Sequence, residues 1–284
     1  MILQNRHKIG RINSVKIPTD KVSECRGVKR CCNPRLVVAD LTSSDSWKND
    51  ITSAWIRLGT SLDSATFRLV KSDGTEILLT GLEFPNHENS YYTTFEWKTI
   101  LSDYGAGLYT LFIDWSISGI TGTIEWGEYN LLPYSYDVVK DSIRLKAQFD
   151  HFQQIEGINF KGSDVIDTIR LNGYFGNKQP NTEIDNIIYE NREMKSVIRE
   201  NIGVYELKTD PIAEDVMSIL VDLYLLSEVN LWISDWNAYN HTYFLNDKNV
   251  IVKESPEINY TDSRLASLTC KVEDKFKTNR TYYG

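Results

Sequence analysis

The feature that most constrains the fold is a strict two-residue alternation of apolar and polar side chains. Residues 143–149 place Ile, Leu, Ala and Phe at every second position, with Arg, Lys and Gln between them. Residues 266–272 repeat the pattern, with Ala, Leu, Cys and Val separated by Ser, Thr and Lys. Because successive side chains of a β-strand point to opposite faces, this period predicts strands with one buried face. The chain is therefore expected to be mainly β, built from antiparallel sheets.

Turn and cap signals add detail to the first part of the chain. Asp73-Gly74 lies between two apolar runs and predicts the turn of a β-hairpin. Thr93 followed three residues later by Glu96 has the form of a capping box. The apolar residues of 97–104 then recur at helical spacing, which predicts a short helix that covers a sheet.

The second part shows further strands and one helix. Apolar runs predict strands near 169–175, 231–236 and 249–252, and Gly173 in the first of them indicates a bulge or a close approach of two backbones. Asp210-Pro211 has the residues favoured at a helix start, so a helix is expected near 211–226.

These elements predict two antiparallel β-sandwich-like domains, each with a short covering helix. The first, of immunoglobulin-like size, covers residues 36–138, and the second, β-rich with the one helix, covers residues 139–274. A basic N-terminal arm is expected at 1–35 and a polar C-terminal tail at 275–284.

Charge is distributed unevenly along the chain. The formal net charge is -8, yet residues 1–35 carry nine Lys or Arg and only two acids. Ile and Val are interspersed with these charges, so the segment is too apolar for a purely solvated tail. Three interpretations stay open: docking on an acidic protein surface, which we favour, binding to nucleic acid, or an exposed tail. The basic residues expected to make contacts are Arg6, Lys8, Arg11, Arg26, Lys29 and Arg30.

No metal or cofactor site is evident in the pattern of potential ligands. Cys25, Cys31 and Cys32 have no second ligand pair, and no histidine falls at zinc-finger spacing. Cys270 lies on the apolar face of a predicted strand, where cysteine acts as a small apolar residue. No stretch reaches the ~18 apolar residues of a membrane span, and the N-terminus lacks a signal-peptide pattern, so a soluble protein made in a cytoplasm is expected.

The usual catalytic motifs are also missing from the sequence. There is no nucleophile elbow, phosphate-binding loop, dinucleotide-binding glycine motif or zinc-protease motif. Asp235 and His241 are the most enzyme-like residues, but the spacing provides neither with a catalytic partner. We therefore expect no enzymatic activity and interpret the surrounding aromatic residues as part of a contact surface. These residues are Trp232, Trp236 and Tyr239.

Short motifs rich in aromatic residues and glycine appear in order through both expected domains. They are Phe67–Val70 with Asp73-Gly74, Tyr91–Trp97, Tyr104–Tyr109, Ile169–Asn177, Trp232–Asn237 and Asp274–Asn279. Taken together, these motifs resemble virion structural proteins of tailed phages that infect Bacteroidetes. The resemblance is to tail and neck ring proteins of crAss-like phages, and it spans most of residues 50–280.

The resemblance implies a ring subunit that stacks around the DNA channel of the virion tail or neck. It implies a cyclic homo-oligomer, with 12 or 6 copies as the expected number, in contact with neighbouring phage tail or neck proteins. It implies no catalytic residues and no cofactors. DNA would lie nearby in the channel without specific binding, no membrane would be involved, and the protein would be made in the bacterial cytoplasm before it enters the virion.

A second function is compatible with the same composition. Exposed Trp and Tyr side chains stack on sugar rings, so a carbohydrate-binding module or an adhesin for host glycans is the alternative. An aromatic strip flanked by amides on one exposed sheet face would favour the sugar binder, whereas aromatic residues on opposite faces would favour the ring subunit.

Overall fold

The structure of the protein is a computed structural model. It describes residues 34–57, 64–86, 90–117, 119–140, 142–150, 152–153, 158–188, 190, 192, 194–225, 230–237, 242–243, 246–261, 265–276 and 278–279. Within these ranges the chain is mainly β, as the alternating sequence pattern predicts.

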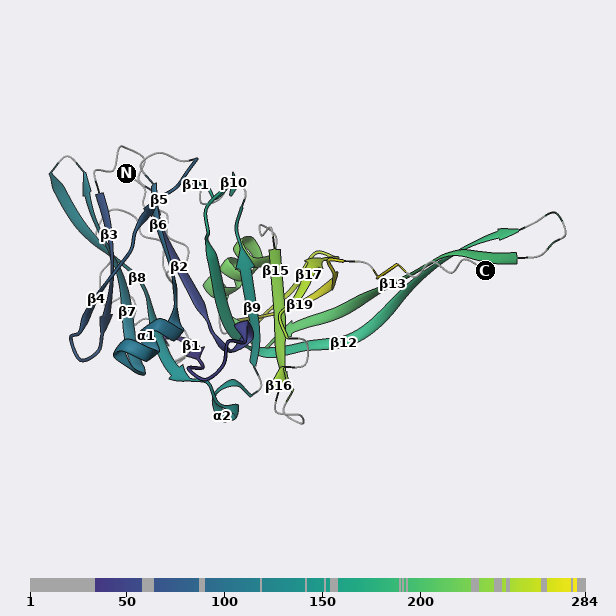
Figure 1. The fold of residues 1–284 in the computed structure, drawn as a ribbon, viewed down its shortest axis with the longest axis horizontal. Coiled ribbons are helices and arrows are strands. Elements are labelled where there is room, and N and C mark those ends of the chain that lie inside the picture. The colour runs from purple at the N-terminus through teal and green to yellow at the C-terminus, as the bar shows by residue number, and fades with distance from the viewer. Residues whose placement is uncertain are drawn as a thin grey trace.

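The first half of the molecule contains a five-stranded sheet in the order β1-β8-β7-β3-β4 (Figure 1). β1 pairs parallel with β8, whereas the other neighbours are antiparallel. The predicted hairpin is confirmed, and its turn places Gly74 at a φ of 91°, which favours glycine. The strands are β1 (Arg35–Ala39), β8 (Ile120–Pro133), β7 (Gly107–Ile117), β3 (Ser64–Lys71) and β4 (Glu76–Leu79).

A three-stranded sheet in the order β2-β6-β5 completes the first half. Its strands are β2 (Ile51–Arg57), β6 (Ser90–Glu96) and β5 (Leu82–Glu83), and helix α1 (Trp97–Tyr104) follows β6. The predicted helix is confirmed, but the capping box is wrong, because Glu96 is the N-cap residue and makes no side-chain cap bond. Thr93 instead lies in strand β6, where its hydroxyl donates a hydrogen bond to the Thr80 carbonyl at 2.8 Å.

The second half closes six antiparallel strands into a barrel. Around the barrel, β9 pairs with β12, β12 with β13, β13 with β19, β19 with β17, β17 with β15, and β15 with β9. The second sandwich expected from the sequence is therefore not confirmed, because the pairing of β13 with β19 closes one sheet on itself. The strands are β9 (Ser142–Gln148), β12 (Ile166–Ile188), β13 (Met194–Thr209), β19 (Leu265–Asp274), β17 (Lys248–Val252) and β15 (Asn230–Asn237).

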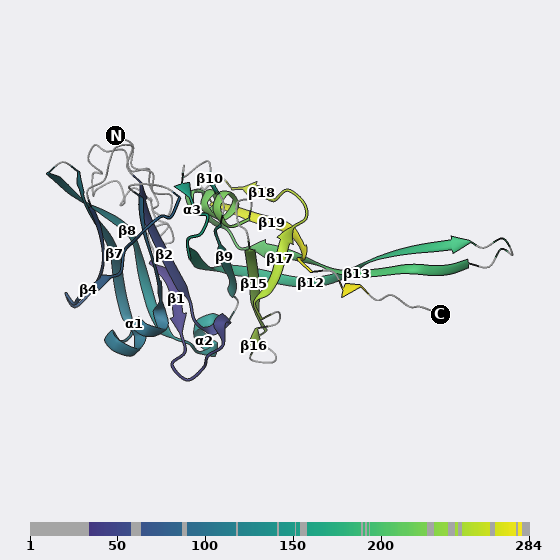
Figure 2. The same ribbon diagram turned by 45° about the horizontal axis from the view of Figure 1, so that its top comes forward.

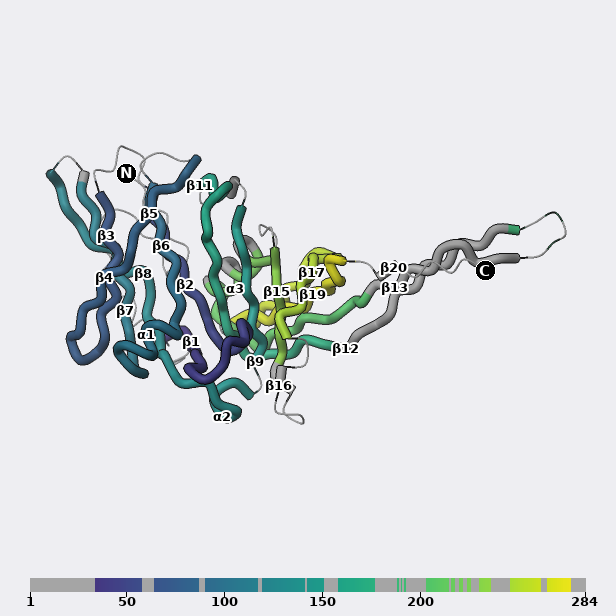
Figure 3. The backbone as a smooth tube through the Cα atoms, in the orientation of Figure 1, coloured from purple at the N-terminus to yellow at the C-terminus, as the bar shows by residue number. Residues whose placement is uncertain are grey.

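Shorter elements connect and cover these sheets. The chain passes from β8 through α2 (Tyr136–Val139) to β9 at the lower edge of the view in Figure 3. The helix near 211–226 exists but begins at Glu214, because the two residues before it pair with β19. The remaining elements are η2 (Ser46–Lys48), β10 (Phe152–Gln153), β11 (Ile158–Asn159), β14 (Ile212–Ala213), α3 (Glu214–Ile219), the π-helix η3 (Leu220–Leu225), β16 (Thr242–Tyr243), β18 (Glu257–Tyr260) and β20 (Thr278–Asn279).

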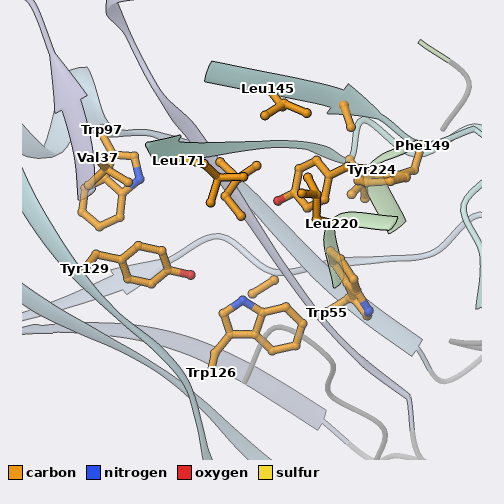
Figure 4. Close-up of a cluster of buried hydrophobic side chains, with 14 of the residues drawn as sticks. Val37, Trp55, Trp97, Trp126, Tyr129, Leu145, Phe149, Leu171, Leu220 and Tyr224 are labelled. Atoms are coloured by element: carbon orange, nitrogen blue, oxygen red, sulfur yellow. The ribbon is translucent and has the colours of Figure 1, made fainter. Parts of the chain in front are cut away.

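One continuous apolar core runs through both halves (Figure 4). Trp55, Trp97 and Trp126 of the first half belong to the same cluster as Phe149 and Tyr224 of the second. The expected layout of two separate domains is therefore not confirmed, because separate domains have separate cores. Much of the aromatic content serves this core rather than a contact surface.

Two smaller predictions from the strand pattern are confirmed. Cys270 is buried in β19 and packs in the core cluster. Gly173 lies where β12 passes close to β13, and a Cβ atom built there would lie 2.4 Å from the Lys208 carbonyl oxygen. Glycine is therefore required at this position by a close approach of two backbones.

Candidate interaction surfaces

The interface residues expected from the sequence fall partly outside the described ranges. Trp232 lies on β15, half-buried, with the Lys146 ammonium 4.7 Å from its ring centroid. Trp236 lies in β15 opposite Tyr243, but its side chain is outside the described residues. Arg6, Lys8, Arg11, Arg26, Lys29, Arg30, Tyr239 and His241 all lie outside the described residues.

Arg35, which the sequence placed at the end of the basic arm, is part of a strand of the five-stranded sheet. It lies in β1, and its Nη2 donates to the Thr168 carbonyl at 2.7 Å and to Asp167 Oδ2 at 3.3 Å. Tyr224 also donates its hydroxyl to Asp167 Oδ2. Burial and then the charge of Asp167 raise the pKa of Tyr224 well above its ordinary value, so this hydroxyl stays a donor. The last basic residue of the arm segment therefore helps to bind the first half of the molecule to the barrel.

A buried carboxylate, Asp50, joins the two halves at a second place. Arg144 on β9 and Arg170 on β12 lie directly opposite each other, an arrangement of like charges that is destabilising without a counter-charge. Asp50 lies between them: its Oδ1 accepts from Arg144 Nε at 2.8 Å, and its Oδ2 accepts from Arg170 Nε at 2.6 Å. Arg170 Nη2 adds a bond to Oδ1 at 3.1 Å, and the Val38 amide donates to Oδ2 at 2.9 Å.

Asp50 stays ionised in this position. Burial alone would raise the pKa of the carboxyl, but the charges of Arg170 and Arg144 outweigh it and hold that pKa below its ordinary value. Four donors occupy its two oxygens, which fills the usual acceptor capacity of a carboxylate. The arrangement is suited to holding strands together.

A second carboxylate, Asp247, completes the surroundings of Arg144. Its Oδ1 accepts from Arg144 Nη1 at 2.7 Å, and its Oδ2 accepts from Lys146 Nζ at 2.9 Å. Arg144 Nη2 also donates to the carbonyls of Ser46 and Asn49, at 3.1 and 3.0 Å. Burial opposes ionisation of Asp247, but Arg144 and Lys146 lower its pKa overall. Three of the four bonds that this guanidinium donates therefore fix the segment before β2 against the barrel.

Sequence reasoning missed this cluster, although a signal was present. Arg144 and Arg170 each occupy the centre of an Ile-Arg-Leu tripeptide, at 143–145 and 169–171. Strand alternation predicts that these arginines face solvent if the other face is buried. Here both faces are buried, one in the barrel and the other against the first half. The repeated Ile-Arg-Leu tripeptide is the sequence pattern that could have indicated the pairing of Arg144 with Arg170.

Asp235, the most enzyme-like carboxylate in the sequence, lies near the end of β15. Its Oδ2 accepts a hydrogen bond from the Phe175 amide at 3.3 Å. This contact ties β15 to β12 next to Gly173, where β12 has already lost its pairing with β9. The geometry therefore gives Asp235 a role in holding the barrel wall.

The two edge strands of the five-stranded sheet differ. At β1 the Asp50 amide donates to the Val38 carbonyl at 3.0 Å, while the Asp50 carboxylate accepts from the Val38 amide. Asn49 Oδ1 accepts from the Asp40 amide at 2.9 Å just beyond. These bonds cap the β1 edge. At β4, on the other side of the sheet, no strand pairs with the outer edge among the described residues.

Strands β12 and β13 continue past the barrel as a two-stranded ribbon (Figures 1 and 2). β12 loses its pairing with β9 after Asn172, whereas its pairing with β13 continues from Gln179 opposite Val204 to Ile188 opposite Met194. At about 3.4 Å per residue, that stretch is about 30 Å long. Apart from β20, which pairs with β13, no further strand covers this ribbon in the described part of the chain.

No protein-family model matches the chain, and no curated protein sequence matches it either.

Within the described ranges, no helix is long and apolar enough to cross a membrane. Nor do the described residues contain a group of three or more His, Cys, Asp or Glu placed to hold a metal ion.

Proposed function

We propose that this protein is a non-enzymatic structural subunit of a tailed-phage virion. It assembles with copies of itself into a ring in the tail or neck and links neighbouring tail proteins around the DNA channel. The virion context rests on the resemblance of the short sequence motifs, and the assembly role rests on the architecture of the second half.

The observation that carries the assembly role is the β12–β13 ribbon. A two-stranded ribbon has no core of its own and is marginally stable in water unless another layer covers it. Over the stretch from Gln179 to Ile188, β12 pairs with β13 alone among the described strands. A subunit that meets its neighbours through such an extension gains the missing layer on assembly.

The buried charges favour the same conclusion. Asp50, Arg144, Arg170 and Asp247 are bonded to one another and to backbone groups at the junction of the two halves. These bonds make the junction rigid, and a rigid body suits a subunit that must present fixed contact surfaces.

The test is the assembly state of the full-length protein, alone and within particles. Native mass spectrometry and electron microscopy of the purified chain should show a closed ring, with 12 or 6 copies as the expected number. Immunolabelling of purified phage should place it in the tail or neck. A protein that stays monomeric and is absent from particles would contradict the proposal. Binding of the monomer to host glycans would favour the carbohydrate-binding alternative, and hydrolysis of those glycans would indicate an enzyme.

A further inference from the structure

Several strand edges in the described part of the chain have no strand partner, and two of them lie at opposite ends of the molecule. One is the outer edge of β4, the last strand of the five-stranded sheet. The other is the edge of β12 that faces away from β13, beyond the point where β9 ends its pairing at Asn172. An unpaired edge presents a row of N–H and C=O groups and is a template for pairing with another strand.

The direction of the β4 backbone groups follows from the ladder with β3. The Lys71 amide donates to the Thr75 carbonyl at 2.9 Å, which makes these two opposite residues a hydrogen-bonded pair. Hydrogen-bonded and non-hydrogen-bonded pairs alternate along an antiparallel ladder. The pairs Val70–Glu76 and Arg68–Leu78 are therefore of the non-hydrogen-bonded kind. The amides and carbonyls of both β4 residues in these pairs point to the open edge.

The β4 edge is short and begins with the charged Glu76, but among the described residues it has no Lys, no Pro and no covering segment. Natural edge strands are commonly blocked by Lys, by Pro, by a bulge or by a covering segment. β4 reads Glu-Ile-Leu-Leu, and the Leu78 side chain is 73% exposed. The β1 edge of the same sheet is capped by Asp50 and Asn49. This contrast indicates that the β4 edge is kept available for a partner.

The ribbon offers the matching edge. β20 pairs with Glu200 and Asn201 of β13, so on that side the outer edge is partly occupied. On the other side, β12 has no pairing with a described strand other than β13 over residues 177–188. This stretch is longer than β4, which spans four residues. Pro180 has no N–H group to donate, so the edge available for pairing is the stretch after it, residues 181–188, which is still longer than β4.

The positions of the two edges in the molecule show whether one copy or two copies could bring them together. In both ribbon views β4 lies at one end of the long axis and the β12–β13 ribbon extends at the other end, with the barrel between them (Figures 1 and 2). The two edges of one copy are therefore held apart by its own body. A second copy, placed head to tail, brings its ribbon to the β4 edge of the first. Contacts of this heterologous kind form rings when the rotation closes.

We propose that residues 181–188 of one copy pair with β4 of the next copy and extend its five-stranded sheet by one strand. Main-chain hydrogen bonds to Glu76 and Leu78 supply the attachment, and the exposed Leu78 side chain is covered by the added strand. This inference rests on the proposed function, because it names the contact that joins neighbouring subunits of the ring.

The first test changes the β4 edge and leaves the fold intact. Leu78→Lys places a charge at the open edge, and Ile120→Lys is the matched control, because Ile120 is 67% exposed at the β7–β8 turn. Both variants and the wild type are compared at micromolar concentration by native mass spectrometry, with circular dichroism to establish folding. We expect Leu78→Lys to weaken assembly at least tenfold and Ile120→Lys to leave it unchanged. Equal assembly of Leu78→Lys and the wild type would overturn the inference.

The second test identifies the partner directly. A photo-cross-linking amino acid replaces Ile184 in the ribbon of isotopically labelled protein, which is then mixed with unlabelled protein. We expect cross-links between this position and residues 76–79 of a differently labelled copy. Cross-links of Leu78 to residues 1–33 of its own chain, found with the cross-linker at position 78, would assign the β4 edge to the basic arm and overturn the inference.

The failures of the two proposals are distinguishable. If the wild type forms rings and Leu78→Lys forms them equally well, the strand contact is wrong and the assembly function stands. If the wild type is monomeric at every concentration and absent from particles, both the function and the contact are wrong.

Discussion

The two halves of this molecule differ in whether their main sheet has free edges. The second half closes six strands into a barrel, so that each wall strand has a neighbour on both sides at the level of the closure. The first half leaves its five-stranded sheet open, with one edge capped by Asp50 and Asn49 and the other edge formed by β4. Closure removes edges altogether, whereas an open sheet must block them or use them.

The difference shows how a single set of polar bonds can serve two purposes. Asp50 caps β1 through the Val38 amide and, with the same carboxylate, neutralises Arg144 and Arg170 on the barrel wall. The protected edge of the open sheet is therefore also the place where the two halves join. The remaining open edge, at β4, lies away from this junction (Figure 1).

The largest effect is expected from removing the carboxylate at the junction. Asp50→Ala leaves two buried guanidinium groups facing each other without a counter-charge, and breaking a buried ion pair on one side typically costs about 3–5 kcal/mol. Urea unfolding followed by tryptophan fluorescence measures the loss in free energy of unfolding. Asp137→Ala is the control, because that carboxylate is 83% exposed beside Lys140, and about 0.5 kcal/mol is expected there. Equal losses in free energy of unfolding for the two variants would contradict the role of Asp50 in joining the two halves.

A somewhat smaller effect is expected at the seam that closes the barrel. Leu207 of β13 lies opposite Cys270 of β19, and both side chains are buried. Leu207→Ala leaves a cavity in this seam and should lower the free energy of unfolding by about 2–4 kcal/mol. Leu78→Ala, at the open β4 edge, should change it by less than about 0.5 kcal/mol in the unassembled protein, because Leu78 is exposed. Similar losses at both positions would show that closure adds little to stability.

The third comparison is between two glycines, Gly173 where the β12–β13 ribbon leaves the barrel and Gly74 in the β3–β4 turn. Gly173 has a φ of 156°, and an added Cβ would lie 2.4 Å from a backbone oxygen of β13. Gly173→Ala should therefore cost about 1–3 kcal/mol, because the backbone of one strand has to move. Gly74 in the β3–β4 turn also has positive φ, but nothing lies within 4 Å of its added Cβ. Gly74→Ala should cost only about 1 kcal/mol. Thermal unfolding of both variants measures the difference, and equal costs would contradict the close approach.

The sequence predicted the strands of both halves better than their arrangement. Alternation in 143–149 and 266–272 identified β9 and β19, and Asp-Gly identified the β3–β4 turn. These signals are local, since each depends on which face of one strand is buried. Closure of the barrel depends on the pairing of β13 with β19. These two strands are far apart in the sequence, so their pairing leaves no local sequence pattern. The β-strands expected for the second half are therefore confirmed, whereas the sandwich layout is not.

The junction cluster was missed for a related reason. Arg144 and Arg170 have the sequence pattern of solvent-facing residues, and only the packing of the first half on the barrel buries them. Trp55, Trp97 and Trp126 fill the core, whereas Trp232 and Trp236 were expected at a contact surface. A single sequence does not distinguish a buried aromatic residue from one at a contact surface, because both occur at apolar strand positions.

A pH-dependent effect of about 1 kcal/mol should distinguish the junction from the rest of the molecule. The pKa of Asp50 is lowered in the folded protein, so its stabilising contribution is present above the unfolded-state pKa of about 3.9 and is lost as the pH falls through the folded-state pKa. Between about pH 5 and pH 3, the wild type should lose about 1 kcal/mol more than Asp50→Asn, which has no proton to gain. Urea unfolding at a series of pH values measures both curves. Parallel curves would show that folding leaves the pKa of Asp50 unchanged, and a wild type that gains stability relative to Asp50→Asn at low pH would show that the carboxyl is protonated in the folded state.

The smallest effect is expected from an ion pair on the open face of the first half. Arg68 Nη1 lies 2.8 Å from Glu76 Oε1, but the Glu76 side chain is 58% exposed, and Arg68 also bonds to Asp114 at 3.1 Å. Glu76→Gln should therefore lower the free energy of unfolding by less than about 0.5 kcal/mol. Because exposed charges are screened by salt, this small difference should vanish in about 0.5 M salt, whereas the loss caused by Asp50→Ala should persist. Unfolding of both variants at low and high salt measures the contrast. A salt-resistant loss at Glu76 equal to that at Asp50 would mean that the open face of the sheet, like the junction, is shielded from water.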